Sequence, residues 1–256
     1  MPLVNGVTDY NTPVYGGEVR TAVGQPAGVF YGYKTNGVYA TEADAANANL
    51  KILNQNGSYS YFKAGDVRFV DGDKNGNKDG VIDANDKQII GNPNPKLYGN
   101  ISSKISYKKL TLSTLFTYSY GNDVYNYQRS QLESGTDYSN QSTVMLSRWT
   151  AEGQNTSQPK AVFGDPMGNA SFSDRWIEDG SYLRLKTVTL SYAIPIKSNF
   201  IEGFSIWISA NNLVTFTKYL GSDPEFSTRN SVLFQGVDAG LVPLSKSYYV
   251  GLKLNL

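Results

Sequence analysis

The last ten residues of the chain alternate between apolar and polar side chains with a period of two. Residues 247–256 place one set of side chains on the same side of that period: Tyr248, Val250, Leu252, Leu254 and Leu256. This spacing is typical of a β-strand with one apolar face, because successive side chains of a strand point to opposite sides. About ten residues also suffice for a tilted β-strand to cross a lipid bilayer. One strand alone leaves open whether its apolar face contacts lipid or a protein core.

Four further segments carry the same alternation. In one of them, Leu110, Leu112 and Phe116 alternate with serine and threonine side chains. Arg184 and Lys186 break the apolar row of another segment, so we expect the first part of that strand to stand above the lipid. Together with the carboxyl-terminal segment, these are the predicted strands: residues 97–107, 110–120, 182–194, 204–217 and 247–256.

The connections between the predicted strands alternate in length. Lys108 and Lys109 alone separate the first pair, and residues 197–203 join the third strand to the fourth, whereas residues 121–181 and 218–246 form long connections. Bacterial outer-membrane β-barrels have short periplasmic turns, long extracellular loops and aromatic residues at both interfaces. The lengths therefore favour such a barrel, and on this interpretation the chain ends in the periplasm.

The composition agrees with strands and excludes several other classes of protein. The mean hydropathy is -0.37, and the chain has no unbroken apolar run of roughly 18 residues, which argues against a helical membrane protein. The 23 basic and 22 acidic residues nearly balance, so we expect no nucleic-acid partner. Cysteine and histidine are absent, which removes disulfides, thiolate ligands and the commonest general base. The 19 tyrosines suit a membrane interface, although an ordinary tyrosine-rich β protein would also contain them.

A segment ahead of the first long strand follows the pattern of a calcium-binding loop. Oxygen-bearing side chains occupy positions one, three, five, nine and twelve, which are Asn75, Asn77, Asp79, Asp83 and Asp86. Gly80 at position six permits the sharp turn that such loops need, and Ca²⁺ takes about 6 to 8 oxygen ligands. These residues are therefore the predicted metal ligands, with Ca²⁺ as the predicted ion.

Two features of this loop depart from the pattern. Asn75 stands where Asp is usual, and Asp86 stands where the longer Glu binds more easily through both oxygens. Asp71 and Asp73 lie just upstream and open a second register, but that register has Ile82 where its closing acid should be. The alternative interpretation is a solvated turn of Asn, Asp and Gly residues.

The acidic residues elsewhere do not indicate an enzyme. Glu178 and Asp179 are adjacent, so on a strand they point to opposite faces, and we expect both to be exposed charges. Asp223 and Glu225 flank Pro224 and could share a face, but no other feature supports a hydrolase. We therefore predict no catalytic residue and no cofactor-binding residue.

Several motifs in a fixed order resemble one family. Gly-Asp-Val-Arg-Phe-Val-Asp at 65–71 precedes the Asn/Asp/Gly loop, and Ile-Gly-Asn-Pro-Asn-Pro-Lys at 90–96 leads into the first long strand. This order closely resembles SusC/RagA-type TonB-dependent outer-membrane transporters. Essentially the whole chain takes part, because the same resemblance extends to residues 20–33, 176–186, 209–219, 223–225 and 243–248.

The resemblance implies an all-β fold. The chain would be a portion of an antiparallel transmembrane β-barrel with long extracellular loops. Residues 1–96 would form an extracellular loop or hairpin region that carries the calcium-like turn, and residues 97–256 would form the carboxyl-terminal strands. Residues 42–49 and 123–133 are predicted to form short helices within loops. Family barrels have roughly 22 strands. Five strands cannot close such a barrel, and residues 1–6 lack a signal peptide, so we expect a terminal piece without plug or early strands.

The resemblance also implies a function. It is the energised import of large nutrients, oligosaccharides or peptides, across the outer membrane of a Gram-negative cell. A SusD-like surface lipoprotein would close the extracellular side, and the TonB complex would act through the missing amino-terminal part. Tyrosines such as Tyr125, Tyr127 and Tyr138 could stack on sugar rings, but packing explains any single one as well, and no substrate-binding residue is assigned.

A different class of function stays open from the residues alone. A secreted, calcium-stabilised β-rich module that binds glycans or mediates adhesion would share the strand pattern and the loop. That module would be soluble without detergent and would melt at a temperature that depends on calcium. A barrel portion would instead depend on detergent and aggregate through its open sheet edges.

Overall fold

The chain divides into two compact units, and each is described by itself. The computed structural model describes residues 8–54, 56–72, 76–197, 200–226, 231 and 234–255. Unit 2 consists of Pro95–Asn122, Asp179–Phe226 and Leu241–Leu256. Unit 1 consists of Met1–Asn94, Asp123–Glu178 and Ser227–Gly240. The sequence predicted a single division after residue 96, whereas the two later segments of unit 1 lie within the long connections between the strands of unit 2.

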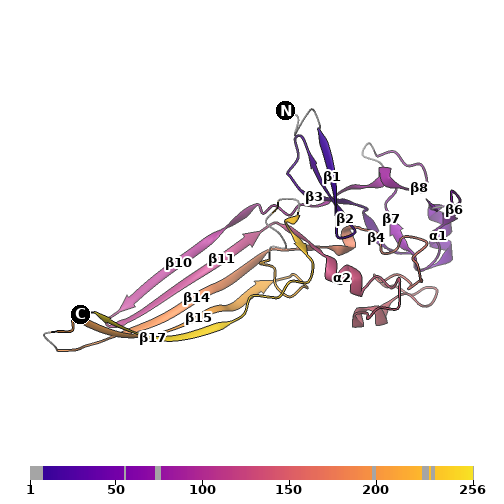
Figure 1. The fold of residues 1–256 in the computed structure, drawn as a ribbon. Coiled ribbons are helices and arrows are strands. Elements are labelled where there is room, and N and C mark those ends of the chain that lie inside the picture. The colour runs from indigo at the N-terminus through magenta and orange to yellow at the C-terminus, as the bar shows by residue number, and fades with distance from the viewer. Residues whose placement is uncertain are drawn as a thin grey trace. The chain divides into compact units, whose positions relative to one another are not determined.

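Unit 2 is one antiparallel sheet of long strands. Its five strands lie side by side in chain order, and only short turns join β10 to β11 and β14 to β15 (Figure 1). Lys108, with a φ of 56°, forms the tight turn between the first two strands. The strands are β10 (Leu97–Tyr107), β11 (Leu110–Tyr120), β14 (Tyr182–Ile194), β15 (Gly203–Thr217) and β17 (Ser247–Asn255). The segments predicted from alternation fall on these strands.

The register of unit 2 aligns the apolar sides of all five strands into one face. One row across the sheet consists of directly paired apolar residues: Ile105, Leu112, Leu190, Ile208 and Val250. Four of these side chains are exposed, from 37 % at Leu112 to 73 % at Val250, and Leu190 is half-buried. No described part of unit 2 covers this apolar face. The sheet therefore presents its apolar side outward, contrary to the usual arrangement in a water-soluble domain.

A β-bulge corrects the expectation for the two charges that break the apolar row. Leu115 of β11 pairs with Thr187 and Phe116 with Leu185, so β14 contains one extra residue, Lys186, at this point. The neighbouring β15 is also irregular here, where Asn212 has a φ of 52°. A bulge changes which side chains share a face. Leu183 and Leu185 therefore continue the apolar face, and Arg184 lies on the opposite side. The charges do not interrupt the apolar row as a strict period of two predicts.

Unit 1 is made of short strands in several small sheets. A four-stranded sheet has the order β1 (Asp9–Val14), β2 (Gly17–Ala22), β3 (Val29–Gly32) and β9 (Gln88–Gly91). A two-stranded sheet pairs β4 (Thr35–Val38) with β7 (Val67–Phe69). One three-stranded sheet has the order β6 (Tyr59–Tyr61), β5 (Lys51–Leu53) and β8 (Val81–Ile82). Another has the order β13 (Ile177–Asp179), β12 (Asp123–Asn126) and β16 (Val237–Asp238).

Aromatic side chains form the core of unit 1 in two clusters. The first contains Val14, Val19, Phe30, Tyr125, Trp176 and Val237. The second contains Tyr39, Ala45, Phe62, Val67, Phe69 and Ile82. Because these residues come from segments far apart in the chain, burial of large rings holds the short strands together. Unit 1 thus has a conventional interior.

Short helices connect the strands of unit 1. Helix α1 (Glu42–Ala48) begins where Thr41 Oγ1 accepts a hydrogen bond from Asp44 N, and it ends at Asn49 in the left-handed conformation. The helix predicted over residues 123–133 is wrong in its first part, because residues 123–126 form β12 and pair with β16. The remaining helices are α2 (Tyr127–Leu132) and the 3₁₀ turns η1 (Ala84–Asp86), η2 (Thr143–Ser147) and η3 (Asp174–Trp176). In the described residues, every helix is too short or too polar to span a bilayer.

Candidate functional site

In the predicted calcium loop of unit 1, carboxylate side chains accept hydrogen bonds from backbone amides of the same loop. Asp83 begins η1, where its Oδ1 accepts from Asn85 N at 2.7 Å. Asp86 reaches back, and its Oδ2 accepts from Asp83 N at 2.8 Å, which completes a capping box. Asp79 Oδ1 accepts from Val81 N at 2.8 Å. Three of the predicted ligands therefore use carboxylate oxygens to shape the backbone.

The other two predicted ligands are asparagines. Asn77 lies on an exposed part of the loop, and Asn75 lies outside the described residues. Within the described residues, no three acidic side chains converge in a way that could hold a metal ion. The upstream Asp71, however, folds onto the loop, because its Oδ2 accepts from Gly80 N at 3.0 Å.

Asp86 is the most buried carboxylate of this loop. It is 3 % exposed, and its Oδ1 accepts from Gly72 N at 2.9 Å. Burial raises the pKa of Asp86; its amide hydrogen bonds partly oppose this shift, and the nearby carboxylates of Asp71 and Asp83 add to it. Burial, reinforced by Asp86 and Asp83, also raises the pKa of Tyr33 to about 12. Negative charge is thus concentrated in a poorly solvated place.

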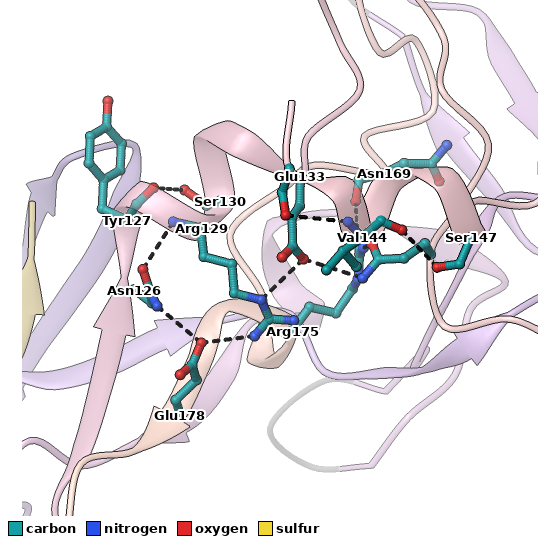
Figure 2. A network of polar contacts seen from close by, with 12 residues as sticks. Asn126, Tyr127, Arg129, Ser130, Glu133, Val144, Ser147, Asn169, Arg175 and Glu178 are labelled. Carbon is teal, nitrogen blue, oxygen red and sulfur yellow. Dashed lines mark hydrogen bonds and ion pairs between the residues drawn. The ribbon is translucent and has the colours of Figure 1, made fainter. Parts of the chain in front are cut away.

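A second polar cluster in unit 1 links helix α2 to two distant segments (Figure 2). Arg129 donates from Nε to Glu133 Oε2 at 3.1 Å and from Nη1 to Glu178 Oε1 at 3.0 Å. Asn126 Nδ2 donates to the same Glu178 oxygen at 3.2 Å, and Gln158 Nε2 donates to Glu133 at 3.3 Å. Each charged group of this cluster has a partner, so the cluster fastens loops rather than presenting a reactive group.

Arg175 extends this cluster beside Trp176. Its guanidinium lies 4.6 Å from the ring of Trp176, and it donates to Asn169 O at 2.7 Å and to Gln158 Oε1 at 3.1 Å. Burial, followed by the charge of Arg129, lowers the pKa of Arg175 to about 10. A buried guanidinium stacked on tryptophan and bonded to a backbone carbonyl stabilises a loop.

The expectation that Glu178 and Asp179 are both exposed is wrong for Glu178. The Glu178 side chain is 9 % exposed because it pairs with Arg129. Asp179 is exposed, and its Oδ1 accepts from Ser181 N at 2.9 Å. Alternation in the sequence could separate the two side chains but could not identify the arginine that covers one of them.

A buried charge cluster in unit 2 explains the acidic pair around Pro224. Arg184 donates to Asp223 and lies 3.3 Å from Glu225, while Lys186 Nζ lies 2.8 Å from Glu225. Asp223 Oδ2 also accepts from Leu244 N at 3.0 Å. These acids neutralise two basic side chains on the polar face of β14, so they serve packing of the long connection and not hydrolysis.

The three tyrosines proposed to stack on sugars have different environments in unit 1. Tyr125 is buried in the core, and Tyr127 packs on Tyr15 with 5.1 Å between ring centroids. Tyr138 is 92 % exposed and stacks on Phe163 at 5.1 Å between ring centroids. Of these three tyrosines, only Tyr138 is largely exposed, and its partner Phe163, which no sequence pattern indicated, is exposed as well.

Comparisons with known proteins identify the family. No protein-family model matches the chain. TonB-dependent receptor P3 of Formosa agariphila is 29 % identical over 239 residues, which is 90 % of this chain and 22 % of the relative. TonB-dependent receptor SusC of Bacteroides thetaiotaomicron is 30 % identical over 71 % of this chain and 17 % of its own length. A structure of the RagAB peptide importer in a closed-closed state superimposes with a TM-score of 0.71 at 26 % identity, covering 98 % of this chain and 25 % of that chain.

The chain belongs to the SusC/RagA-type TonB-dependent receptors. The resemblance stated from its motifs is thereby confirmed, and so is the all-β fold class of a barrel portion. The chain spans only a quarter or less of the length of these relatives. The names of the relatives describe receptors and a peptide importer rather than enzymes. The polar clusters around Arg129 and Arg184 are accordingly explained by their structural role, which is to hold loops in place.

Proposed function

We propose that this chain is the carboxyl-terminal part of the β-barrel of a TonB-dependent importer in the outer membrane of a Gram-negative cell. The observation that carries the proposal is the uncovered apolar face of unit 2. Its directly paired row from Ile105 to Val250 crosses all five strands. A face of this kind costs free energy in water but is stabilised by lipid. The opposite face, with Arg184 and many serine and threonine side chains, would line the barrel interior.

The edges of the unit 2 sheet support the same proposal. β10 and β17 are the first and last strands of the sheet, so each has one side without a neighbour in the sheet. Unpaired backbone groups in a bilayer cost several kcal/mol each, and closed barrels avoid this cost. In the complete receptor, other strands of the barrel would pair with both edges.

The cargo and the partners follow from the relatives as proposals. The import would concern a large nutrient, an oligosaccharide or a peptide, and a SusD-like lipoprotein would cover the outer opening. The TonB complex would supply energy through other parts of the receptor. The exposed pair of Tyr138 and Phe163 in unit 1 is a suitable surface for such contacts, since aromatic rings bind both sugars and peptides.

The native size of the protein tests this proposal. An antibody to residues 247–255 would be used on isolated outer membranes, with and without boiling before electrophoresis. We expect a band several times larger than this chain that changes mobility on boiling, as folded barrels do. A soluble protein of the size of this chain, with melting that depends on calcium, would overturn the proposal and favour the secreted glycan-binding or adhesion module.

A further inference from the structure

One oxygen of Asp71 in unit 1 is buried without a partner among the described residues. Asp71 is 9 % exposed, and its Oδ1, which is inaccessible to solvent, accepts no hydrogen bond from the part of the chain that the structure describes. A buried carboxylate oxygen without a donor or a cation is costly, so a native structure normally satisfies it. The other oxygen, Oδ2, accepts from Gly80 N at 3.0 Å. That bond places Asp71 against the glycine at position six of the predicted calcium loop.

Asp86 is bonded to the backbone next to Asp71. Its Oδ1 accepts from Gly72 N, the residue that follows Asp71, at 2.9 Å. Asp86 is 3 % exposed, and within the described residues no ion pair joins Asp71 or Asp86 to a lysine or an arginine. Two buried carboxylates beside each other repel unless a positive charge lies between them.

We propose that Asp71 and Asp86 bind a divalent cation, Ca²⁺, and that Asp71 takes the place of Asn75 as the first ligand. Carboxylate oxygens are the ligands that Ca²⁺ prefers, and backbone carbonyls and water complete its shell of about 6 to 8 oxygens. The absence of histidine and cysteine from the chain disfavours zinc and copper. Asp79 and Asp83 keep their roles in the backbone hydrogen bonds of the loop.

The structure suggests what the cation does. Asp71 follows β7, whose Phe69 is buried in the second core cluster, and Asp86 ends η1, which follows the buried Ile82 of the same cluster. A cation between them would fasten the two ends of the loop to one core. Because the loop supplies few carboxylates, we expect a dissociation constant on the order of 10⁻⁴ to 10⁻³ M, as in extracellular calcium modules.

Binding of radioactive calcium to the complete receptor tests the inference. The receptor would be purified in detergent and freed of metal with a chelator. We expect Asp71→Asn to lose one bound calcium, or to bind it at least about tenfold more weakly. The matched controls are Asn75→Ala, which tests the position predicted from sequence, and Asp137→Asn, which removes an exposed acid from unit 1. Both controls should bind as the unmodified receptor does.

Three binding results would overturn the inference: unchanged binding in Asp71→Asn, loss of binding in Asn75→Ala alone, or no calcium bound to the unmodified receptor at ~10 mM. If Asp71→Asn fails to fold, tryptic cleavage of the unmodified receptor, with and without calcium, tests the site instead. Calcium should slow tryptic cleavage after Lys78, and unchanged cleavage at saturating calcium would also refute the site. Neither assay measures import or membrane insertion, so failure here leaves the proposed function standing.

Discussion

The two units of this chain bury opposite kinds of side chain. Unit 1 encloses large rings such as Phe30 and Trp176, which are 0 % and 1 % exposed. Unit 2 leaves its apolar face open and buries an ion pair, since Arg184 is 2 % exposed. One chain therefore contains a domain suited to water and a sheet suited to lipid. Burial by protein alone therefore does not show which apolar side chains are kept away from water. The apolar face of unit 2 is not covered by its own unit, and it is proposed to contact the lipid bilayer.

The largest expected effect comes from emptying the conventional core. Phe30→Ala in unit 1 should destabilise the receptor by about 3–5 kcal/mol, because the rigid surroundings cannot fill the cavity. Ile105→Ala on the apolar face of unit 2 should cost less than half of that, since lipid or detergent fills the space. Chemical unfolding of both variants in detergent checks the comparison. Equal losses would mean that the apolar face is covered by protein.

A charge on the apolar face should have the next largest effect. Leu190→Arg is expected to destabilise the barrel by about 2–4 kcal/mol if it lies near the bilayer midplane. Ser191→Arg introduces the same group on the opposite face of the same strand and should cost much less. Folding into lipid vesicles measures both. A greater loss in Ser191→Arg would reverse the assignment of the two faces.

The buried ion pair of unit 2 should contribute more than an exposed pair of unit 1. Asp223→Asn leaves Arg184 with Glu225 alone and should cost about 2 kcal/mol. Asp9→Asn breaks the pair between Asp9 and Arg20, whose side chains are 43 % and 21 % exposed, and should cost less than about 1 kcal/mol. Unfolding in urea at low and high salt measures both. Similar losses would show that solvent reaches Arg184.

Alkaline pH should weaken unit 1 through Tyr33. The pKa of this phenol rises from 10.0 to about 12 on folding, so the neutral form is favoured in the folded state. The associated stability is complete below the unfolded value and is lost as the pH rises toward the folded value. Tyr33→Phe should therefore lose less stability than the unmodified receptor when the pH is raised above 10. Parallel pH profiles would refute this role for Tyr33.

The smallest effect on stability is expected at the exposed aromatic pair. Tyr138→Ala should change the free energy of unfolding by less than about 0.5 kcal/mol, because Tyr138 is 92 % exposed. Uptake of the nutrient by cells should fall if the ring contacts cargo or the lipoprotein. Tyr120→Ala, an exposed tyrosine of unit 2, is the control for uptake. A large loss of stability in Tyr138→Ala would instead assign the ring to packing.

The sequence predicted the strands of unit 2 better than the architecture of unit 1. Alternation is a local signal, and it suffices where each strand of unit 2 has one apolar side, as from Leu110 to Tyr120. Unit 1 depends on contacts between distant segments. Residues 123–126 were predicted as helix because their partner, Val237, lies more than a hundred positions away. No local pattern reports such a pairing.

The candidate sites show the same limit. The calcium pattern stays a prediction, and it could not reveal that Asp71 folds back onto Gly80. Similarly, the position of Glu178 depends on Arg129, which arrives on a different element. Side chains that a motif spaces along the chain are predictable, whereas those that the fold brings together are not.

The bulge at Lys186 lets the apolar face of β14 change from even-numbered to odd-numbered residues. On one side of it Val188 and Leu190 face outward, and on the other side Leu183 and Leu185 do. A strand of strictly regular period through this point would act as a frameshift in space rather than in the gene. Arg184 and Lys186 would then lie on the same side as Val188 and Leu190, toward the bilayer.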